Sequence, residues 1–363
     1  MKTLILFYSF FLIHPLLLQS QTDQAVKPIS INYMEMGNNK SDSGNVHLKY
    51  NDIKVATRFY SDAIKDYKKA IKANPSIYIG YYKLGIIQTK LKDYKNAMKN
   101  FDKAVAIDSS IGSIFLERGI SQFSQGKSKE ALLDYNKAIN INFEDASALY
   151  QRGLLYAARQ ASKLAIEDYS LVIEIQPKFE NAYMKRGIIY NSINKDYVLA
   201  LIDFNKVIEL NPENNDAYFW RGKTKYKGED FSGADKDLSR FIEYEPNNID
   251  ALIIRGACRI NINNNAGAIS DFDEVIILDP KNIVAYMNRG LAKGGLKKYK
   301  EALQDIDLAI KIKFDYSPAY INRAAVKFAS GDKKGACKDL AKADGLNNEK
   351  AYKLIDQYCK DGN

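Results

Sequence analysis

Few residues of this 363-residue chain could carry out chemistry. Its only histidines are His14 and His47, and its three cysteines are Cys258, Cys337 and Cys359. Nucleophilic catalysis needs a nucleophile beside an oriented base, and a zinc site needs clustered His, Cys or carboxylate ligands. The sequence supplies neither set, and no glycine-rich phosphate loop follows a strand pattern. We therefore expect no catalytic residue, no metal and no cofactor, and we predict that the protein is not an enzyme.

A pairing of opposite charges recurs instead along most of the chain. In seven successive segments an arginine is followed, sixteen or seventeen residues later, by an aspartate: Arg118 and Asp134, Arg152 and Asp168, Arg186 and Asp203, Arg221 and Asp237, Arg255 and Asp271, Arg289 and Asp305, and Arg323 and Asp339. The segment before these has Leu84 and Asn100 instead, so both charges vanish together. This covariation predicts a structural ion pair in each segment. The alternative is an arginine ladder for a polyanion, which would not require the matching aspartate.

The arginines belong to a repeat with a period of 34 residues and one step of 35. A glycine follows the arginine position in all copies but the last, where alanine stands: Gly85, Gly119, Gly153, Gly187, Gly222, Gly256, Gly290 and Ala324. Each copy contains two runs of apolar residues at helical spacing, separated by a polar turn. A glycine inside a helix costs about 1 kcal/mol relative to alanine, so its recurrence predicts a close approach between the two helices of a copy. The extra residue of the long step we place in the turn around Asn194.

A fixed period of this length is typical of solenoids. The pattern resembles the tetratricopeptide repeat family over residues 47–346, which would hold about nine copies, the first a degenerate one with Asn51 in the glycine position. The resemblance implies an all-α fold, an α-solenoid of paired antiparallel helices stacked into a right-handed superhelix. It also implies a concave groove, lined by first helices, that binds a protein or peptide. Residues 347–363 are expected to form a cap helix and a tail.

One pair of adjacent copies departs from the rest at the position two residues before the glycine. Six copies have a polar residue there, whereas two neighbouring copies have Trp220 and Ile254. The resemblance places this position at the edge of the groove, where an exposed apolar patch would indicate a contact site. Tyr226 and Lys227 could extend this patch. The alternative is that the superhelix covers these side chains.

The start of the chain predicts export. Lys2, an apolar stretch from Leu4 to Leu18 and a polar continuation are typical of a secretory signal peptide, here residues 1–20. The alternative is an uncleaved membrane anchor. Residues 21–46 are largely polar and are expected to form a flexible lead-in. A periplasmic or secreted location would permit a disulfide between Cys337 and Cys359, while Cys258 is expected to be a buried thiol.

The net charge of +9 is concentrated near the start of the array. Residues 44–108 contain twelve Lys, one Arg and six Asp. The leading hypothesis is an exported, non-catalytic scaffold that binds a protein or peptide partner in its groove. The alternative is an assembly factor of the cell envelope that binds anionic glycan or lipid through the basic first copies; salt would weaken only this second mode. Nucleic acid is not expected as a partner, nor is a membrane beyond the signal segment.

Overall fold

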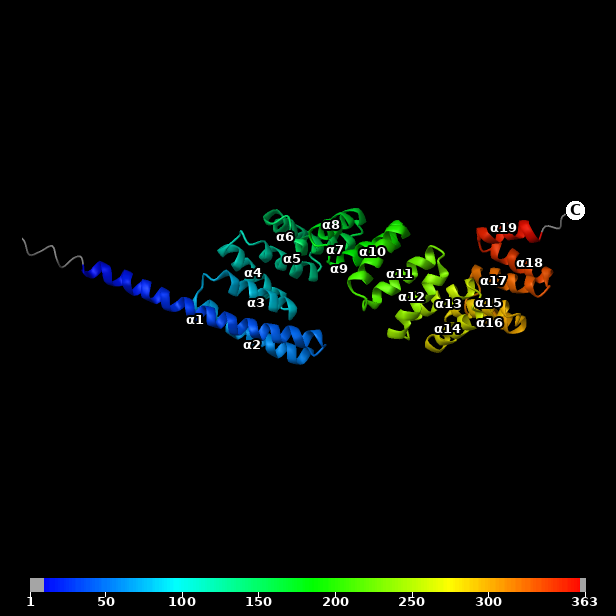
Figure 1. Cartoon of the computed structure of the whole chain (residues 1–363), viewed down its shortest axis with the longest axis horizontal. Coiled ribbons are helices and arrows are strands. Elements are labelled where there is room, and N and C mark those ends of the chain that lie inside the picture. The colour runs from blue at the N-terminus through cyan, green and yellow to red at the C-terminus, as the bar shows by residue number, and fades with distance from the viewer. Residues whose placement is uncertain (1–9, 360–363) are drawn as a thin grey trace, which may run out of the picture. The chain divides into compact units, whose positions relative to one another are not determined.

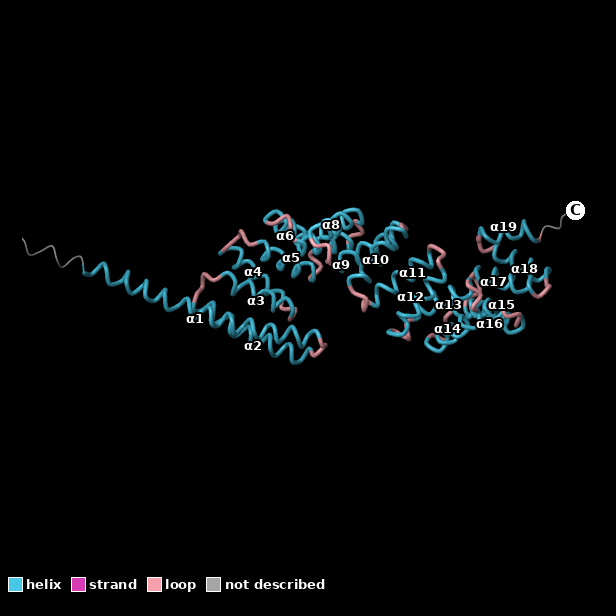
Figure 2. Tube along the Cα trace, in the orientation of Figure 1, coloured by secondary structure: helices cyan, strands magenta, loops and turns pink. Residues whose placement is uncertain are grey.

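The structure is a computed structural model that describes residues 10–359, with side chains from residue 29 onward. These residues form nineteen α-helices and one π-helical turn, and they contain no strand (Figures 1 and 2). They divide into two units between Pro177 and Lys178, and each unit is a stack of helix pairs. The predicted all-α solenoid is confirmed.

The first unit contains four helix pairs: α1 (Phe10–Lys49) with α2 (Ile53–Ala73), α3 (Tyr78–Lys90) with α4 (Tyr94–Ile107), α5 (Gly112–Ser124) with α6 (Ser128–Ile141), and α7 (Ala146–Ala158) with α8 (Ser162–Ile175).

The second unit contains five pairs and a final helix: α9 (Glu180–Ile189), continued by the π-helical turn η1 (Tyr190–Asn194), with α10 (Tyr197–Leu210), α11 (Asn215–Lys227) with α12 (Phe231–Tyr244), α13 (Ile249–Asn261) with α14 (Asn265–Leu278), α15 (Ile283–Gly295) with α16 (Tyr299–Ile312), α17 (Ser317–Ala329) with α18 (Lys333–Asp344), and α19 (Glu349–Tyr358).

Within each unit the first helices of successive pairs pack against one another. Helix α5 contacts both α3 and α7 in the first unit, and α11, α13, α15 and α17 form a continuous row in the second. Successive second helices make no contact of comparable extent within residues 10–359. The first helices therefore form an inner layer and the second helices an outer layer, which is the arrangement that gives a solenoid its concave side.

The two helices of a pair approach closely at the repeated glycine. A β-carbon at Gly153 would lie only 2.6 Å from Cε1 of Tyr169, whose ring is fully buried. The other six glycines of this position face a ring or a branched aliphatic side chain in the same way, at 2.6–2.9 Å. The glycine thus lies against the large residue that follows it by sixteen or seventeen positions in the second helix.

The segment expected to be a flexible lead-in has a different structure. Residues 29–46 belong to α1 and pack against α2, with Met34 buried in a shared core. The sequence reads as polar there because small residues, rather than large apolar ones, make the contact. Gly37 lies against Tyr67 and Gly44 lies against Tyr60.

The first pair is also where the expected glycine position is corrected. Asn51 is a turn residue with φ of 60°, directly before the N-cap Asp52, and not part of a helix crossing. Gly44 and Tyr60 form the regular crossing, sixteen residues apart like the others. Helix α2 has 21 residues against 14 in α4, and this added length accommodates a second crossing between Gly37 and Tyr67.

Each tyrosine of this first pair donates a hydrogen bond to the asparagine that follows its glycine. The Tyr60 hydroxyl lies 2.9 Å from Oδ1 of Asn45, and the Tyr67 hydroxyl lies 2.9 Å from Oδ1 of Asn38. A buried hydroxyl needs such a partner, so two Gly-Asn dipeptides seven residues apart serve both packing and hydrogen bonding.

The predicted signal segment, residues 1–20, lies outside the residues whose side chains are described. Within the described part of the chain, no helix has the length and apolar character that crossing a membrane requires.

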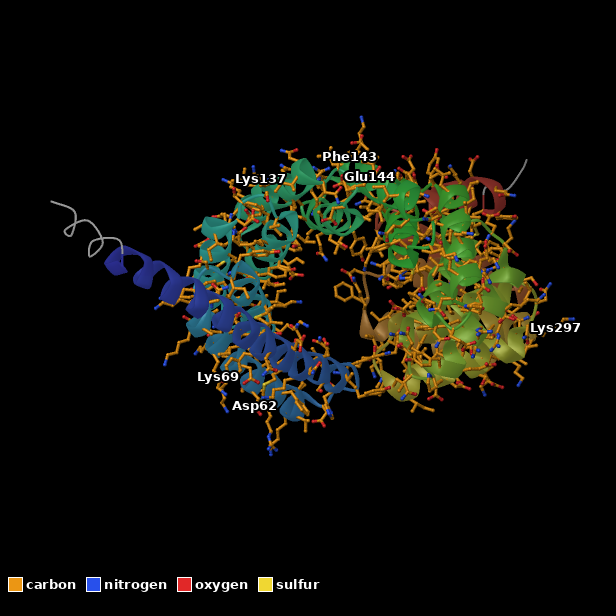
Figure 3. The ribbon with its side chains drawn as sticks, turned by 60° about the vertical axis from the view of Figure 1, so that its left-hand side comes forward. Asp62, Lys69, Lys137, Phe143, Glu144 and Lys297 are labelled. Atoms are coloured by element: carbon orange, nitrogen blue, oxygen red, sulfur yellow. A yellow bond between two sulfur atoms is a disulfide. The ribbon has the colours of Figure 1, made fainter. Side chains whose placement is uncertain are left out.

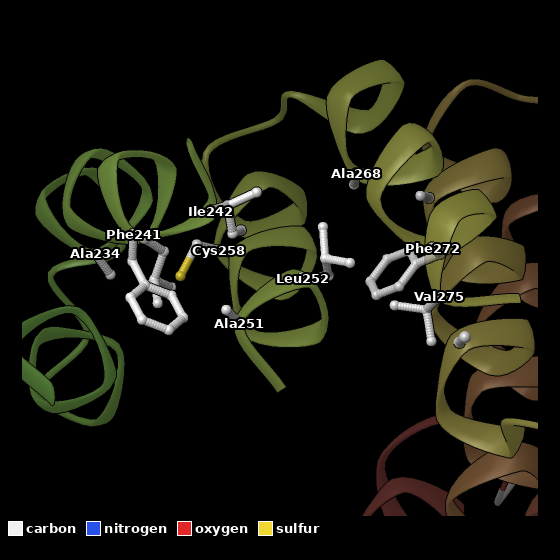
Figure 4. Close-up of a cluster of buried hydrophobic side chains, with 12 residues drawn as sticks. Ala234, Phe241, Ile242, Ala251, Leu252, Cys258, Ala268, Phe272 and Val275 are labelled. Atoms are coloured by element: carbon white, nitrogen blue, oxygen red, sulfur yellow. The ribbon is translucent and has the colours of Figure 1, made fainter. Parts of the chain in front are cut away.

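The cysteines occupy the predicted environments. Cys258 is a fully buried free thiol in the core between α12 and α14, on the side of α13 that faces Phe241 (Figure 4), and burial raises the pKa of this thiol to about 12. Cys337 and Cys359 form a disulfide with a Cα–Cα distance of 5.7 Å. This bond fixes the C-terminal end of α19 to α18, and Ala351 near the start of α19 is buried in the shared core.

We predict that Gly153→Ala destabilises the protein by about 2 kcal/mol, because overpacking at Tyr169 outweighs the helix preference of alanine. Urea unfolding followed by helical circular dichroism should show a lower midpoint. Gly228→Ala is the matched control: its φ is −87° and the nearest atoms to an added β-carbon are 3.6 Å away. Equal midpoints for the two variants would contradict the assigned crossing.

Candidate binding surface

Every predicted Arg–Asp pair forms in the structure. The closest nitrogen–oxygen distances between the paired side chains are 2.5–2.8 Å in all seven copies. Both Nε and Nη2 of each arginine donate to the carboxylate, as Arg152 does to Asp168. The arginine side chains are only 14–21% exposed, so their guanidinium groups do not project as a free ladder. This geometry excludes the polyanion alternative for these residues.

In at least six of the seven copies the remaining guanidinium nitrogen joins the pair to the preceding second helix. In six copies Nη1 donates to a polar side chain sixteen residues earlier: Asp102, Asn136, Asn205, Ser239, Asp273 and Asp307. The Arg–Asp covariation does not predict this contact, although the residue after each large core position is consistently a short acceptor. The arginines therefore connect neighbouring repeats of the outer layer as well as the two helices of one repeat.

A second cation reaches the same aspartate in several copies, three residues after the glycine position. Lys225 contacts Asp237 at 2.8 Å and Arg259 contacts Asp271 at 2.9 Å. Lys293 and Lys327 do the same for the aspartates of the last two copies. In the first pair, Lys40 contacts Asp66 from the corresponding position after Gly37. The sequence therefore contains a second recurring cation, always three residues after the glycine position.

The copy without charges satisfies its polar groups in another way. Asn100, which replaces the aspartate, donates from Nδ2 to Oε1 of Gln88 at 2.7 Å, while Leu84 fills the arginine position. Gln88 lies three residues after Gly85. The next copy has Gln122 at the same position, buried, with no hydrogen bond to its Oε1 from the described residues.

Burial and pairing shift the pKa values of the charged groups in opposite senses. Burial raises the pKa of the Asp203 and Asp271 carboxyl groups, although Arg186 and Arg255 oppose the shift. The hydrogen bonds from Arg118 to Asp134 raise the pKa of that guanidinium. A buried carboxylate is unfavourable without its cation, which explains why the two residues change together in the neutral copy.

We predict that Arg118→Leu or Asp134→Asn alone destabilises the protein by roughly 3 kcal/mol. Arg118→Leu leaves the buried carboxylate of Asp134 without its cation, and Asp134→Asn leaves the largely buried guanidinium of Arg118 without its anion. The double variant should recover most of this loss. It recreates the neutral copy, because the amide introduced by Asp134→Asn can donate to Oε1 of Gln122.

Urea unfolding of the four proteins gives the coupling between the two sites. Lys206 and Glu209 form an exposed pair whose removal should change stability by less than about 1 kcal/mol, and they provide the control. Additive losses in the double variant would show that the pair is not the stabilising unit.

The predicted contact residue Trp220 lies on the inner-layer helix α11. Its side chain is half-buried, whereas the polar residues of the sister copies predict an exposed position. Its ring stacks near Phe204 of α10, with centroids 6.4 Å apart, and meets Phe219 edge-on at 5.7 Å. Nζ of Lys223 lies 5.2 Å from its centroid. The indole is therefore supported on one side and accessible on the other.

The extra residue of the long repeat contributes to this support. The repeat pattern predicts this extra residue in the turn around Asn194. In the structure it is accommodated by the π-helical turn η1, which continues α9. Asn191 of η1 is fully buried and its Nδ2 donates to Thr224 Oγ1, and this hydroxyl donates to the Trp220 carbonyl at 2.7 Å. π-helical turns of this kind occur often at functional sites.

The other predicted contact residues differ in their surroundings. Ile254 is half-buried and packs on the core between α12 and α14. Tyr226 packs on the same core and against Phe231, and burial raises its pKa, so it does not extend a surface patch. Lys227 is exposed, and its Nζ lies 3.3 Å from Oδ1 of Asn191. Trp220 and Lys227 thus share one face of α11, because seven residues make nearly two helical turns. Tyr226, six residues after Trp220, points to a different face.

The basic first copies carry most of their lysines on the outer layer. Nine exposed lysines lie on or beside α2 and α4: Lys54, Lys65, Lys68, Lys69, Lys72, Lys92, Lys95, Lys99 and Lys103. Lys69 points away from the ribbon in Figure 3, and so does Asp62, which pairs with Lys65 at 2.8 Å. The charges are interspersed, as on a solvated surface. Among residues 29–359, whose side chains are described, no three His, Cys, Asp or Glu side chains converge as metal ligands.

Comparison with known proteins agrees with this architecture. Tetratricopeptide repeat profiles match residues 52–110, 146–179, 216–248 and 283–316, and a TPR repeat profile matches residues 119–160. Together they cover just over half of the chain. The chain belongs to the tetratricopeptide repeat family.

Solved structures of this tetratricopeptide repeat architecture are similar to parts of the chain. PilF of Pseudomonas aeruginosa is 17% identical, covers 57% of this chain and 94% of its own, and has a TM-score of 0.51, which shows the shared fold. YrrB, a TPR protein with an unusual peptide-binding site, is 28% identical over 51% of this chain and 95% of its own, with a TM-score of 0.49. No curated protein matches the sequence.

Proposed function

We propose that this tetratricopeptide repeat protein is a non-catalytic scaffold that binds a protein or peptide partner on the inner layer of its first helices. The observation that carries the proposal is Trp220. It is the only tryptophan of the chain, and it occupies an inner-layer position that holds polar residues in six sister copies. Tryptophan is enriched among binding hot spots, which are surrounded by contacts that contribute little energy.

The surroundings of Trp220 support this reading. Phe204 and Phe219 limit the movement of the indole, so little conformational entropy would be lost when a partner covers it. Lys223 and Lys227 lie on the same helix face, three and seven residues further on. An apolar anchor beside two cations favours a partner segment that carries an apolar residue and acidic neighbours.

We predict that Trp220→Ala weakens partner binding by roughly 2 kcal/mol or more, as loss of a hot spot does. The partner would be captured with the full chain from envelope and secreted fractions of the source cells, and affinities compared with purified variants. Tyr244→Ala is the control, because Tyr244 is an aromatic residue of the outer layer that is 65% exposed.

The single tryptophan also reports directly on the site. A bound partner should protect its fluorescence from acrylamide quenching in the unmodified protein. Unchanged affinity of Trp220→Ala, together with unprotected fluorescence in the complex, would overturn the proposed surface.

We also infer that the protein is exported. The apolar segment between Leu4 and Leu18 supports this, as does the disulfide between Cys337 and Cys359, because such bonds persist in oxidising compartments. The prediction is that protein recovered from the envelope or the medium begins at Gln21. N-terminal sequencing that finds intact Met1 in a cytosolic fraction would contradict it.

The alternative of an envelope factor that binds anionic glycan or lipid is supported only by the lysines of α2 and α4. These lysines lie on the outer layer and are interspersed with aspartates. They support glycan or lipid binding less strongly than Trp220 supports protein binding.

A further inference from the structure

The second unit contains a cavity that neither the repeat pattern nor the Trp220 surface accounts for. It has a volume of about 620 Å³ and lies where the cap helix α19 meets α15, α17 and α18. Its lining is mostly apolar and includes Leu291, Ile321, Ala325, Phe328, Leu354 and Tyr358. The volume is within the range of sites that hold small molecules or anchoring side chains.

The cavity has few polar groups, and both can donate a hydrogen bond to an anionic ligand group. Asn322 and Lys350 line it, and no lining residue is acidic. Lys350 is exposed, and no ion pair with it occurs among the described residues. The site therefore combines a large apolar volume with an unpaired cation and an amide at its edge.

The walls of the cavity are held in place. Phe328 of α17 and Tyr358 of α19 lie with ring centroids 5.7 Å apart. Tyr358 directly precedes Cys359, whose disulfide to Cys337 fixes this end of α19 to α18. A preformed cavity requires less ordering when a ligand binds than a surface that must rearrange.

We propose that this cavity, termed the cap pocket, receives a bulky apolar side chain of a partner protein whose neighbouring carboxylate pairs with Lys350. Charge complementarity selects this occupant: an anionic group suits Lys350, and only an apolar body suits the other walls. Asn322 holds the position that Trp220 holds three repeats earlier. The same extended partner segment could therefore follow the inner layer of the second unit from one site to the other, so the proposal rests on the proposed function.

The test uses 8-anilinonaphthalene-1-sulfonate, an aromatic anion with the predicted chemistry, and the full oxidised chain. Fluorescence titration should show one saturable site. Ala325→Trp fills the pocket from an exposed lining position and should weaken binding at least roughly tenfold, as blocking of an apolar site does. Ala257→Trp, at the same repeat position on α13, is the matched control and should bind normally.

Charge is tested separately on the cap helix. Lys350→Glu should weaken binding of the anion at least roughly threefold, and this loss should diminish at high salt. Lys353→Glu, an exposed residue of α19 that does not line the pocket, should have little effect. Circular dichroism verifies that each variant is folded. Unchanged binding in both Ala325→Trp and Lys350→Glu would overturn the pocket.

The captured partner then separates this proposal from the general function. If Ala325→Trp weakens both the probe and the partner, the cap pocket is part of the partner site. If it weakens only the probe while Trp220→Ala still weakens the partner, the scaffold function stands and the cap pocket proposal fails. If the captured material binds all variants equally, the proposed function fails even where the probe defines a pocket.

Discussion

The structure depends on one close approach that recurs in every repeat but the last, where Ala324 replaces the glycine. A glycine of the first helix lies directly against a large side chain of the second, as Gly153 does against Tyr169. This brings the two backbones close enough to bury an aspartate beside the crossing, and the buried carboxylate then requires a cation. The arginine next to the glycine supplies that cation. Packing and charge are thus consequences of the same geometry, which is why the neutral copy exchanges Arg and Asp together.

The same arginine explains how neighbouring repeats are joined. Its third nitrogen reaches the preceding second helix, for example from Arg289 to Asp273 at 2.6 Å. Second helices make little direct contact with one another, so these charged contacts link an outer layer that packing alone leaves separate. The inner side of the first helices takes no part in these contacts. There the residue at the repeat position of Trp220 differs from copy to copy. A constant structural layer therefore supports a variable surface, which suits a binding protein.

Much of the fold could be predicted because the repeats within the chain can be aligned with one another. The period, the Arg–Asp pairs and the cysteines close to the cap follow from comparing one copy with the next. What could not be predicted involves departures from the period. The first pair has a second crossing at Gly37 and Tyr67, thirty residues apart, and a fixed spacing of sixteen cannot find it. A period likewise cannot distinguish an extra residue in a turn from one absorbed as a π-helical turn at Asn191.

The binding surface was the least predictable feature. The resemblance to the family predicts that Trp220 lies at the edge of the groove. How much of its ring remains accessible depends on Phe204 and Phe219, whose packing against the indole is seen only in the structure. The cap pocket gives no periodic signal, because α19 occurs once and is positioned by a disulfide.

The central claim is that the partner binds the inner layer, and site-specific photo-crosslinking tests it most directly. Benzoyl-phenylalanine would replace Lys185, an exposed residue two before Gly187 on α9, or Lys236, an exposed residue of the outer helix α12. The account predicts that the captured partner crosslinks to position 185 and not to position 236. Crosslinking at position 236 alone would place the partner on the outer layer and contradict the account.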